Sequence, residues 1–118
     1  MKANLETIKK HLKNNEEILS TIYCTIDLHY ISRSGVLAVT NKKLLFCADY
    51  MFGKGLKWEY EYSSISNIND TNSLILEYSS VPFIKKLIIN YKDELIVFTN
   101  FSSPSKVNKF VELVKIKI

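Results

Sequence analysis

The feature that most constrains the fold of this chain is a pair of apolar runs separated by only two polar residues. Residues 36–40 and 43–50 flank Asn41 and Lys42. The chain must therefore reverse direction between the runs, which is the pattern of a β-hairpin with a two-residue turn. Because Asn adopts positive φ more readily than most residues, we predict that conformation at Asn41.

The segment that follows, residues 56–62, alternates strictly between apolar and charged side chains. A period of two places successive residues on opposite faces and predicts a half-buried antiparallel strand. We expect one face to pack in the core and the other to face water. The core face would carry Leu56, Trp58, Tyr60 and Tyr62, and the outer face Lys57, Glu59 and Glu61.

Two helices are predicted, one towards each end of the chain. Leu5, Ile8 and Leu12 share one face of a helix over residues 4–13, with Asn4 as its N-cap. The second helix shows both a start signal and an apolar stripe. These are Ser103 as the cap, Pro104 at the first helical position, and the stripe Val107, Phe110, Val111 and Val114.

Between the helices we predict about seven strands, so the fold class is mainly β (α+β). Further strand-like runs cover 18–31, 74–79, 83–91 and 95–101, with turns at 32–35, 70–73, 80–82 and 92–94 and a loop at 51–55. We expect one domain over residues 1–118, in which the C-terminal helix caps a barrel of two near-orthogonal antiparallel sheets. Its parts would be a short N-terminal helix (1–15), the barrel (16–101) and the capping helix (103–117).

The charge of the chain is concentrated in its ends. The formal net charge is +4, yet residues 19–103 hold eight basic and eight acidic side chains. Nucleic-acid binders normally gather basic residues on the body of the domain, so this balance makes such a partner unlikely. No apolar run reaches the roughly 20 residues needed to cross a bilayer, and the N-terminus is polar. We expect a cytoplasmic protein.

The sequence carries no recognisable catalytic or metal-binding pattern. His11 and His29 stand outside any ligand spacing, and Cys24 and Cys47 form no C-x-x-C motif. We expect two reduced, buried cysteines, while a disulfide between them stays open as an alternative. We therefore predict no enzymatic activity, no cofactor and no metal site.

Three stretches of the sequence resemble the bacterial pleckstrin-homology (PH) domains of the YokE-like kind. These are the run Gly-Val-Leu-Ala-Val-Thr-Asn-Lys-Lys-Leu-Leu-Phe over 35–46, the segment Tyr-Ser-Ser-Ile-Ser-Asn-Ile over 62–68, and Leu-Lys-Asn-Asn-Glu-Glu-Ile over 12–18. The resemblance implies a PH-like barrel capped by the C-terminal helix, and a docking module without enzymatic activity. Most matched positions are core and turn positions, so they indicate a fold more than a ligand.

The leading functional hypothesis is a non-catalytic binding or assembly module. It would dock a protein or peptide, or a second copy of itself, through loops and sheet edges. The alternative is a module at the membrane periphery that binds anionic lipid headgroups through Arg33 and loop lysines. The candidate contact residues for both are Arg33, Lys42, Lys43, Met51, Phe52, Lys54 and Lys57. Lipid-binding PH domains cluster cations in the first turn of the barrel, whereas residues 30–35 supply Arg33 alone.

Overall fold

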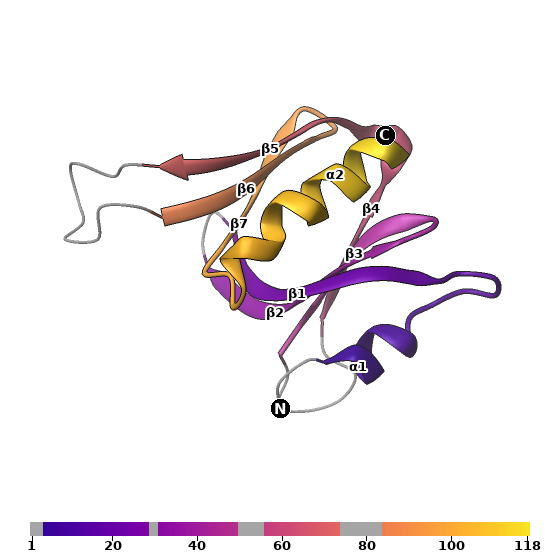
Figure 1. The fold of residues 1–118 in the computed structure, drawn as a ribbon. Coiled ribbons are helices and arrows are strands. Elements are labelled where there is room, and N and C mark those ends of the chain that lie inside the picture. The colour runs from indigo at the N-terminus through magenta and orange to yellow at the C-terminus, as the bar shows by residue number, and fades with distance from the viewer. Residues whose placement is uncertain (1–3, 29–30, 50–55, 74–83) are drawn as a thin grey trace.

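The fold is one antiparallel sheet of seven strands with a helix on each side of its first half (Figure 1). The computed structural model describes residues 4–28, 31–49, 56–73 and 84–118. The chain runs α1 (Leu5–Lys9), β1 (Ile18–Asp27), β2 (Ser32–Thr40), β3 (Lys43–Ala48), β4 (Lys57–Glu61), η1 (Tyr62–Ser64), β5 (Ile65–Ser73), β6 (Ile84–Tyr91), β7 (Glu94–Thr99), η2 (Pro104–Lys106) and α2 (Val107–Lys117).

The strand order β4-β3-β2-β1-β7-β6-β5 joins two antiparallel meanders along a short seam. Strands β1 and β7 pair only from Thr25↔Thr99 to Asp27↔Val97. The two halves then fold face to face, with the Phe46 and Phe98 rings 5.7 Å apart between centroids. The predicted seven strands and PH-like architecture are confirmed, and the two expected sheets are the two halves of one open sheet.

The main core lies between these halves and under α2. The helix buries the predicted stripe Val107, Phe110, Val111 and Val114. The alternation predicted for β4 is also confirmed at its centre, since Tyr60 and Tyr62 are buried and Glu59 and Glu61 are not. Gly35 of β2 has no room for a side chain, because a Cβ atom there would lie 2.1 Å from the carbonyl oxygen of Cys47.

A second, smaller core lies on the outer face of β1–β3, under α1. It contains Ile8, Val36, Ala38, Leu45 and Cys47. The predicted N-cap is confirmed: the side chain of Asn4 accepts a hydrogen bond from the Thr7 N–H in a capping box. The helix ends at Lys9, short of the predicted Lys13.

Several local predictions were wrong. The predicted turn 32–35 forms the start of β2, and 70–73 belongs to β5, which pairs with β6 from Ile65↔Tyr91 to Ser73↔Ile84. The side chain of Ser103 makes no cap hydrogen bond, and the 3₁₀ turn η2 precedes α2 instead. The predicted strand 74–79 and the turn 80–82 lie outside the described residues.

The positive φ predicted at Asn41 was wrong, and the two short hairpin turns adopt different conformations. Asn41 is not among the residues with positive φ; Thr40 closes its turn instead, because its hydroxyl accepts hydrogen bonds from the backbone N–H groups of Lys42 and Lys43. Positive φ occurs at Lys92 (49°) and Asp93 (67°), which form the two-residue turn between β6 and β7. A side chain can thus replace the special backbone conformation that a short hairpin otherwise needs.

Candidate functional site

By the strand registers, the end of β1 and the starts of β2, β4 and β7 lie towards one side of the sheet, which we call the open end. The β1–β2 turn is closed by a hydrogen bond from the Leu28 N–H to the Ile31 carbonyl oxygen. The registers of β2, β3, β4 and β7 bring the start of β2, the end of β3, the start of β4 and the start of β7 to the same end. The Lys42 turn lies at the opposite end of β2 and β3.

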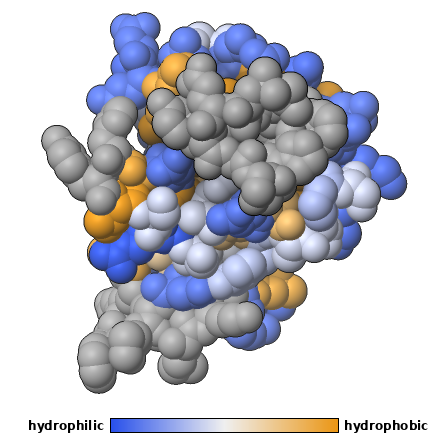
Figure 2. Space-filling model, turned by 90° about the vertical axis from the view of Figure 1, so that its left-hand side faces the viewer, coloured by the Kyte–Doolittle hydropathy of each residue, from blue (hydrophilic) through white to orange (hydrophobic). Residues whose placement is uncertain are grey.

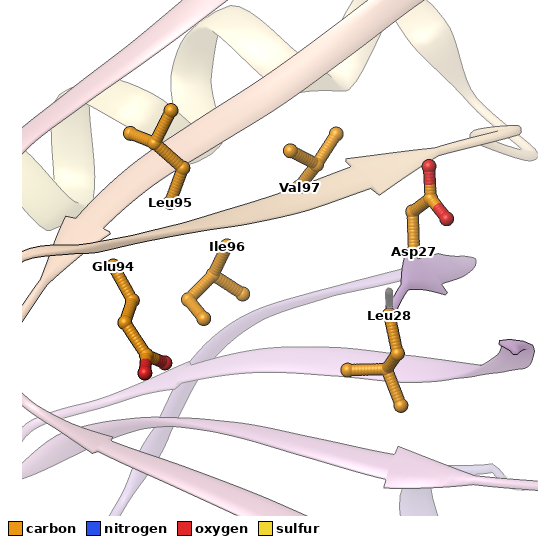
Figure 3. A pocket seen from close by; sticks show the side chains of 6 residues that line it. All are labelled: Asp27, Leu28, Glu94, Leu95, Ile96 and Val97. Carbon is orange, nitrogen blue, oxygen red and sulfur yellow. The ribbon is translucent and has the colours of Figure 1, made fainter. Parts of the chain in front are cut away.

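A hollow of about 490 Å³ opens where β1 and β7 part (Figure 3). Its lining is mostly apolar, with one carboxylate at each end. The lining residues are Asp27, Leu28, Glu94, Leu95, Ile96 and Val97. The last paired positions of the seam are Asp27 and Val97, so β7 continues past the described part of β1 without a partner strand on that side.

The residues around the hollow point to two faces of the sheet. Figure 3 shows Glu94, Ile96 and Leu28 on one side of β7, and Leu95 and Val97 on the other. Leu28 and Ile96 pack against the edge of the main core. The two carboxylates therefore diverge, and they do not form a paired acid site or a metal site.

Three of the exposed large apolar side chains lie towards the open end. Leu95 is 64% exposed, Leu56 52% and Ile31 49%. Figure 2 shows hydrophilic surface over much of one side of the molecule, with an apolar patch at the left that borders it directly. Exposed leucines and isoleucines beside charged groups are typical of surfaces that contact a polypeptide.

Two of the seven predicted contact residues, Arg33 and Lys57, lie near this end. Arg33 is exposed on β2 opposite Ile26, within a strand and not in the predicted turn. The Lys57 ammonium lies 3.3 Å from Glu59, so its charge is already partly paired. Met51, Phe52 and Lys54 fall outside the described residues.

Lys42 and Lys43 are placed away from any common site with Arg33. The Lys42 ammonium donates to the carbonyl oxygen of Asn14 at the far end of the hairpin. Lys43 is buried, with its ammonium 3.4 Å from Glu16 and 3.2 Å from Glu59. Burial of the carboxyl raises the pKa of Glu16, but hydrogen bonds from Lys13 and Thr40 and the charge of Lys43 outweigh this and leave it lowered.

This Glu16–Lys43 pair belongs to a network that holds the Thr40–Lys43 turn. The Thr40 hydroxyl donates to Glu16 Oε2 at 2.6 Å, and the Tyr62 hydroxyl donates to the Thr40 carbonyl oxygen at 2.6 Å. The Asn41 side chain accepts from the Glu17 N–H and donates to the Asn15 carbonyl oxygen. Residues from all three sequence stretches quoted above therefore meet in one structural network, which holds the fold and pairs the charge of Lys43 internally.

The two cysteines lie on opposite faces of the sheet. Cys24 is in the main core and Cys47 is in the smaller core under α1. They also lie on β1 and β3, with β2 between them, so a disulfide would require the sheet to come apart. Burial raises the pKa of both thiols, that of Cys47 to about 11, so both are inert while covered.

The residues that line the hollow were not predicted as a site. Leu28 and Leu95 read as ordinary strand residues, and the hollow arises only because β1 pairs with β7 over three positions. This pairing joins residues about seventy positions apart, for which the sequence carries no local signal. A weak hint was available in Leu95, an apolar residue directly after the polar turn 92–94.

Comparison with known proteins agrees with this architecture. The model of the bacterial PH domain family matches residues 12–116. Among solved structures, the C-terminal domain of an unknown protein from Leishmania infantum superimposes with a TM-score of 0.67 at 16% identity, covering 89% of this chain and 87% of that one. The hSac2 domain from human phosphoinositide phosphatase Sac2 gives 0.63 at 11% identity, covering 95% and 76%.

At these identities the solved structures establish the fold alone. The search of curated proteins found no match. No described helix is long and apolar enough to span a membrane. The family match extends from the segment before β1 to the end of α2, and the strand order and closing helix agree with it. The chain belongs to the bacterial PH domain family.

Proposed function

We propose that this chain is a non-catalytic binding module that docks a protein or peptide segment at the open end of the barrel. PH domains are generally binding modules, and the finer assignment to the YokE-like group rests on the motifs at 12–18, 35–46 and 62–68. The observation that supports a polypeptide partner most directly is the hollow between β1 and β7, where an apolar lining adjoins a stretch of β7 that lies beyond the last described pair with β1.

The backbone of β7 supports the addition of an extended segment. In a two-residue hairpin the closing pair, here Tyr91↔Glu94, exchanges hydrogen bonds, and the pattern then alternates along the strand. The N–H and carbonyl groups of Leu95 therefore point away from β6, towards the side where the described part of β1 has ended. A short peptide strand can use these groups, as in β-strand addition.

The side chains around the hollow indicate the chemistry of that segment. Leu95 and Ile96 offer apolar contacts on the two faces, and Asp27 and Glu94 place a carboxylate on each. Asp27 already accepts a hydrogen bond from the Ser32 hydroxyl at 3.3 Å. An extended segment that carries both an apolar and a basic side chain on each of its faces would complement the hollow, whereas an anionic group would meet negative charge.

The second candidate is the binding of anionic lipid headgroups. The likeness to a domain of a phosphoinositide phosphatase favours it, and Arg33 and Lys57 lie at the open end where a headgroup would approach. Against it, Lys43 is buried and paired and Lys42 lies at the other end of the hairpin. Among the described residues, fewer cations therefore remain for a headgroup than are found in the clusters that hold phosphates in other proteins.

Self-association is a form of the first candidate. Among the described residues, β4 and β5 are the two ends of the sheet, so each offers an edge strand to a second copy. Light scattering at two protein concentrations measures the mass of the chain in solution. A mass that rises to that of a dimer would identify a second copy of the chain as the partner.

The test compares two exposed apolar positions. The chain and its Leu95→Asp and Ile116→Asp variants are immobilised, and proteins retained from a lysate of the source cells are identified. Ile116 is 76% exposed on α2 and is not among the residues that line the hollow, so it is a matched control. We expect a retained protein that is lost with Leu95→Asp and kept with Ile116→Asp. If the Leu95→Asp variant retains the same protein as the unmodified chain, the hollow is not the contact.

The lipid candidate has its own arm. The chain and its Arg33→Glu variant are sedimented with vesicles of phosphatidylcholine containing anionic lipid, at low and at physiological salt. Binding that Arg33→Glu abolishes, combined with no protein retained through Leu95, would replace the first candidate by the second.

A further inference from the structure

We propose that the outer face of β1–β3 is a docking site for an amphipathic helix of a partner protein, and that α1 occupies this site as a removable cover. The site is separate from the hollow at the open end and does not depend on the function proposed there. Figure 1 shows α1 on one side of β1 and β2 and α2 on the other.

The face beneath α1 is as apolar as a protein interior. Ala38 and Leu45 are fully buried, and Val36 and Cys47 are nearly so. These side chains alternate along β2 and β3 with residues of the main core, so the strands are apolar on both faces. Without α1 this face would expose a contiguous apolar patch, which soluble domains normally cover.

The cover itself is slight. Strictly helical residues number five, and of these only Thr7 and Ile8 are buried, whereas Leu5 is 45% exposed. The polar contacts described for α1 are internal, namely the capping box of Asn4 with Thr7 and the Lys9–Glu6 pair at 3.7 Å. A helix this short is unstable alone, so its place depends on Ile8 and the partly buried Leu12.

A defined hinge separates α1 from the barrel. From Lys13 onwards the chain is fixed to the Thr40–Lys43 turn: the Lys13 N–H donates to Glu16, and the carbonyl oxygens of Asn14 and Asn15 accept from Lys42 and Asn41. The family match also starts at residue 12, so the apolar strands lie within the family pattern and α1 lies before it. Helix α1 can therefore leave without disturbing the network around Glu16.

The present occupant defines the chemistry of the partner. The site accepts the apolar side chain of Ile8 from a helix that exposes Lys9, and the side chain of Leu12 from the segment just after that helix. The neighbouring strand β4 places Lys57, Glu59 and Glu61 on the same outer face as Lys43, and Glu59 is already paired with both lysines. The expected partner is thus an amphipathic helix that, like α1, inserts an apolar side chain into this smaller core and can displace α1.

Cys47 reports on this site within the intact chain. Cys47 lies under α1 and Cys24 in the main core, so release of α1 exposes only the first, whereas global unfolding exposes both. We expect a thiol reagent to label Cys47 at least about tenfold faster than Cys24 in the native protein. Replacement of Ile8 by Asp should accelerate Cys47 further and leave Cys24 slow. Leu5→Asp, on the exposed side of α1, is the matched control and should change neither rate.

Binding is then tested with a defined probe. A fluorescein-labelled peptide of residues 2–13 should bind the Ile8→Asp chain saturably and restore the protection of Cys47. The same peptide carrying Ile8→Asp should not bind. The unmodified chain should bind the peptide weakly, because its tethered α1 competes at an effective concentration of order millimolar.

Three results would overturn the proposal. The first is a Cys47 rate unaffected by Ile8→Asp, because α1 would then not be the cover. The second is a Cys47 exposed by that variant but not protected by the peptide, because the face would then not accept a helix. The third is equal labelling of Cys24 and Cys47 in both Ile8→Asp and the milder Ile8→Ala, because the two cores would then open as one unit.

Discussion

The first half of the sheet is apolar on both faces, and the two faces are covered in very different ways. The inner face packs against three strands and an eleven-residue helix, while the outer face has a helix of five residues. Both covers bury their apolar contacts almost completely, with Phe110 1% exposed and Ile8 fully buried. Similar burial therefore does not imply similar stability. We expect the inner helix to unfold together with the sheet, and the outer helix to detach by itself, because it is one short segment.

The largest expected effect is on the inner side. The variant Phe110→Ala removes a fully packed ring of α2 and should lower the free energy of unfolding by about 3–5 kcal/mol. Denaturation followed by Trp58 fluorescence measures the loss. Labelling of Cys24 should accelerate by a larger factor than that of Cys47, because Cys24 is reached only by global unfolding whereas Cys47 is already reached through release of α1. A change confined to Cys47 would contradict the assignment of α2 to the cooperative core.

A smaller effect is expected at the network between the covers. The variant Glu16→Gln leaves the buried Lys43 ammonium with Glu59 alone and should cost about 1–3 kcal/mol. Burial raises the pKa of Glu16 and Glu59, but their hydrogen bonds and the nearby lysines prevail, so the pKa of each in the folded protein lies below the ordinary value of 4.5. Their contribution is complete above pH 4.5 and is lost as pH falls through the folded values.

The acid unfolding curve tests the sign of this effect. The unmodified chain should lose stability below about pH 4.5, where these carboxylates become protonated, and Glu16→Gln should show a shallower loss over the same range. The variant Glu6→Gln, at an exposed position of α1, is the control and should follow the unmodified curve. Parallel curves for all three chains would mean that Glu16 titrates alike in the folded and unfolded states.

The stability of α1, the outer cover, depends on its N-cap residue Asn4. The variant Asn4→Ala removes the capping box of α1 and should weaken the helix by about 1 kcal/mol. Since the loss is local, labelling of Cys47 should rise about fivefold while the unfolding midpoint of the whole domain hardly moves. A drop in the midpoint without selective labelling of Cys47 would place α1 within the cooperative unit.

The smallest effect is expected where neither cover is involved. Leu95→Asp alters a side chain that is 64% exposed and should change the free energy of unfolding by no more than about 0.5 kcal/mol. Urea denaturation of this variant beside Ile116→Asp checks that the binding tests at the open end compare folded proteins. A large loss for Leu95→Asp would show that this residue supports the seam of the sheet.

The parts of the fold that follow local periodicity could be predicted from the sequence. The hairpin at 41–42, the alternating strand 56–62 and the stripe of the last helix depend on residues within one or two turns of each other. The start of β2 at Ser32 and the length of β5 were missed, because polar Ser, Asn and Asp residues favour turns locally while strand pairing overrides that preference. In these two segments, strand formation depends on the neighbouring strand more than on the segment's own residues.

The candidate site was predicted less well. Lys43 occupies an outward position of the hairpin by parity, and only the placement of α1 and Glu16 over that face turns it into a buried residue. The hollow depends on where β1 stops pairing with β7. Both features arise from contacts between distant segments, which charge and periodicity along one segment do not reveal.

The short β1–β7 seam has a consequence for how the chain folds. Each meander joins neighbours in sequence, so its hairpins close small loops at little entropic cost. The ladder from Thr25↔Thr99 to Asp27↔Val97 closes the longest loop in the sheet. Truncation of Ile26 or Phe98 should therefore slow refolding, measured by stopped-flow fluorescence, more than truncation of Tyr60 slows it for the same loss of stability. Formation of these three pairs would then limit the rate at which the two halves of the sheet assemble into one domain.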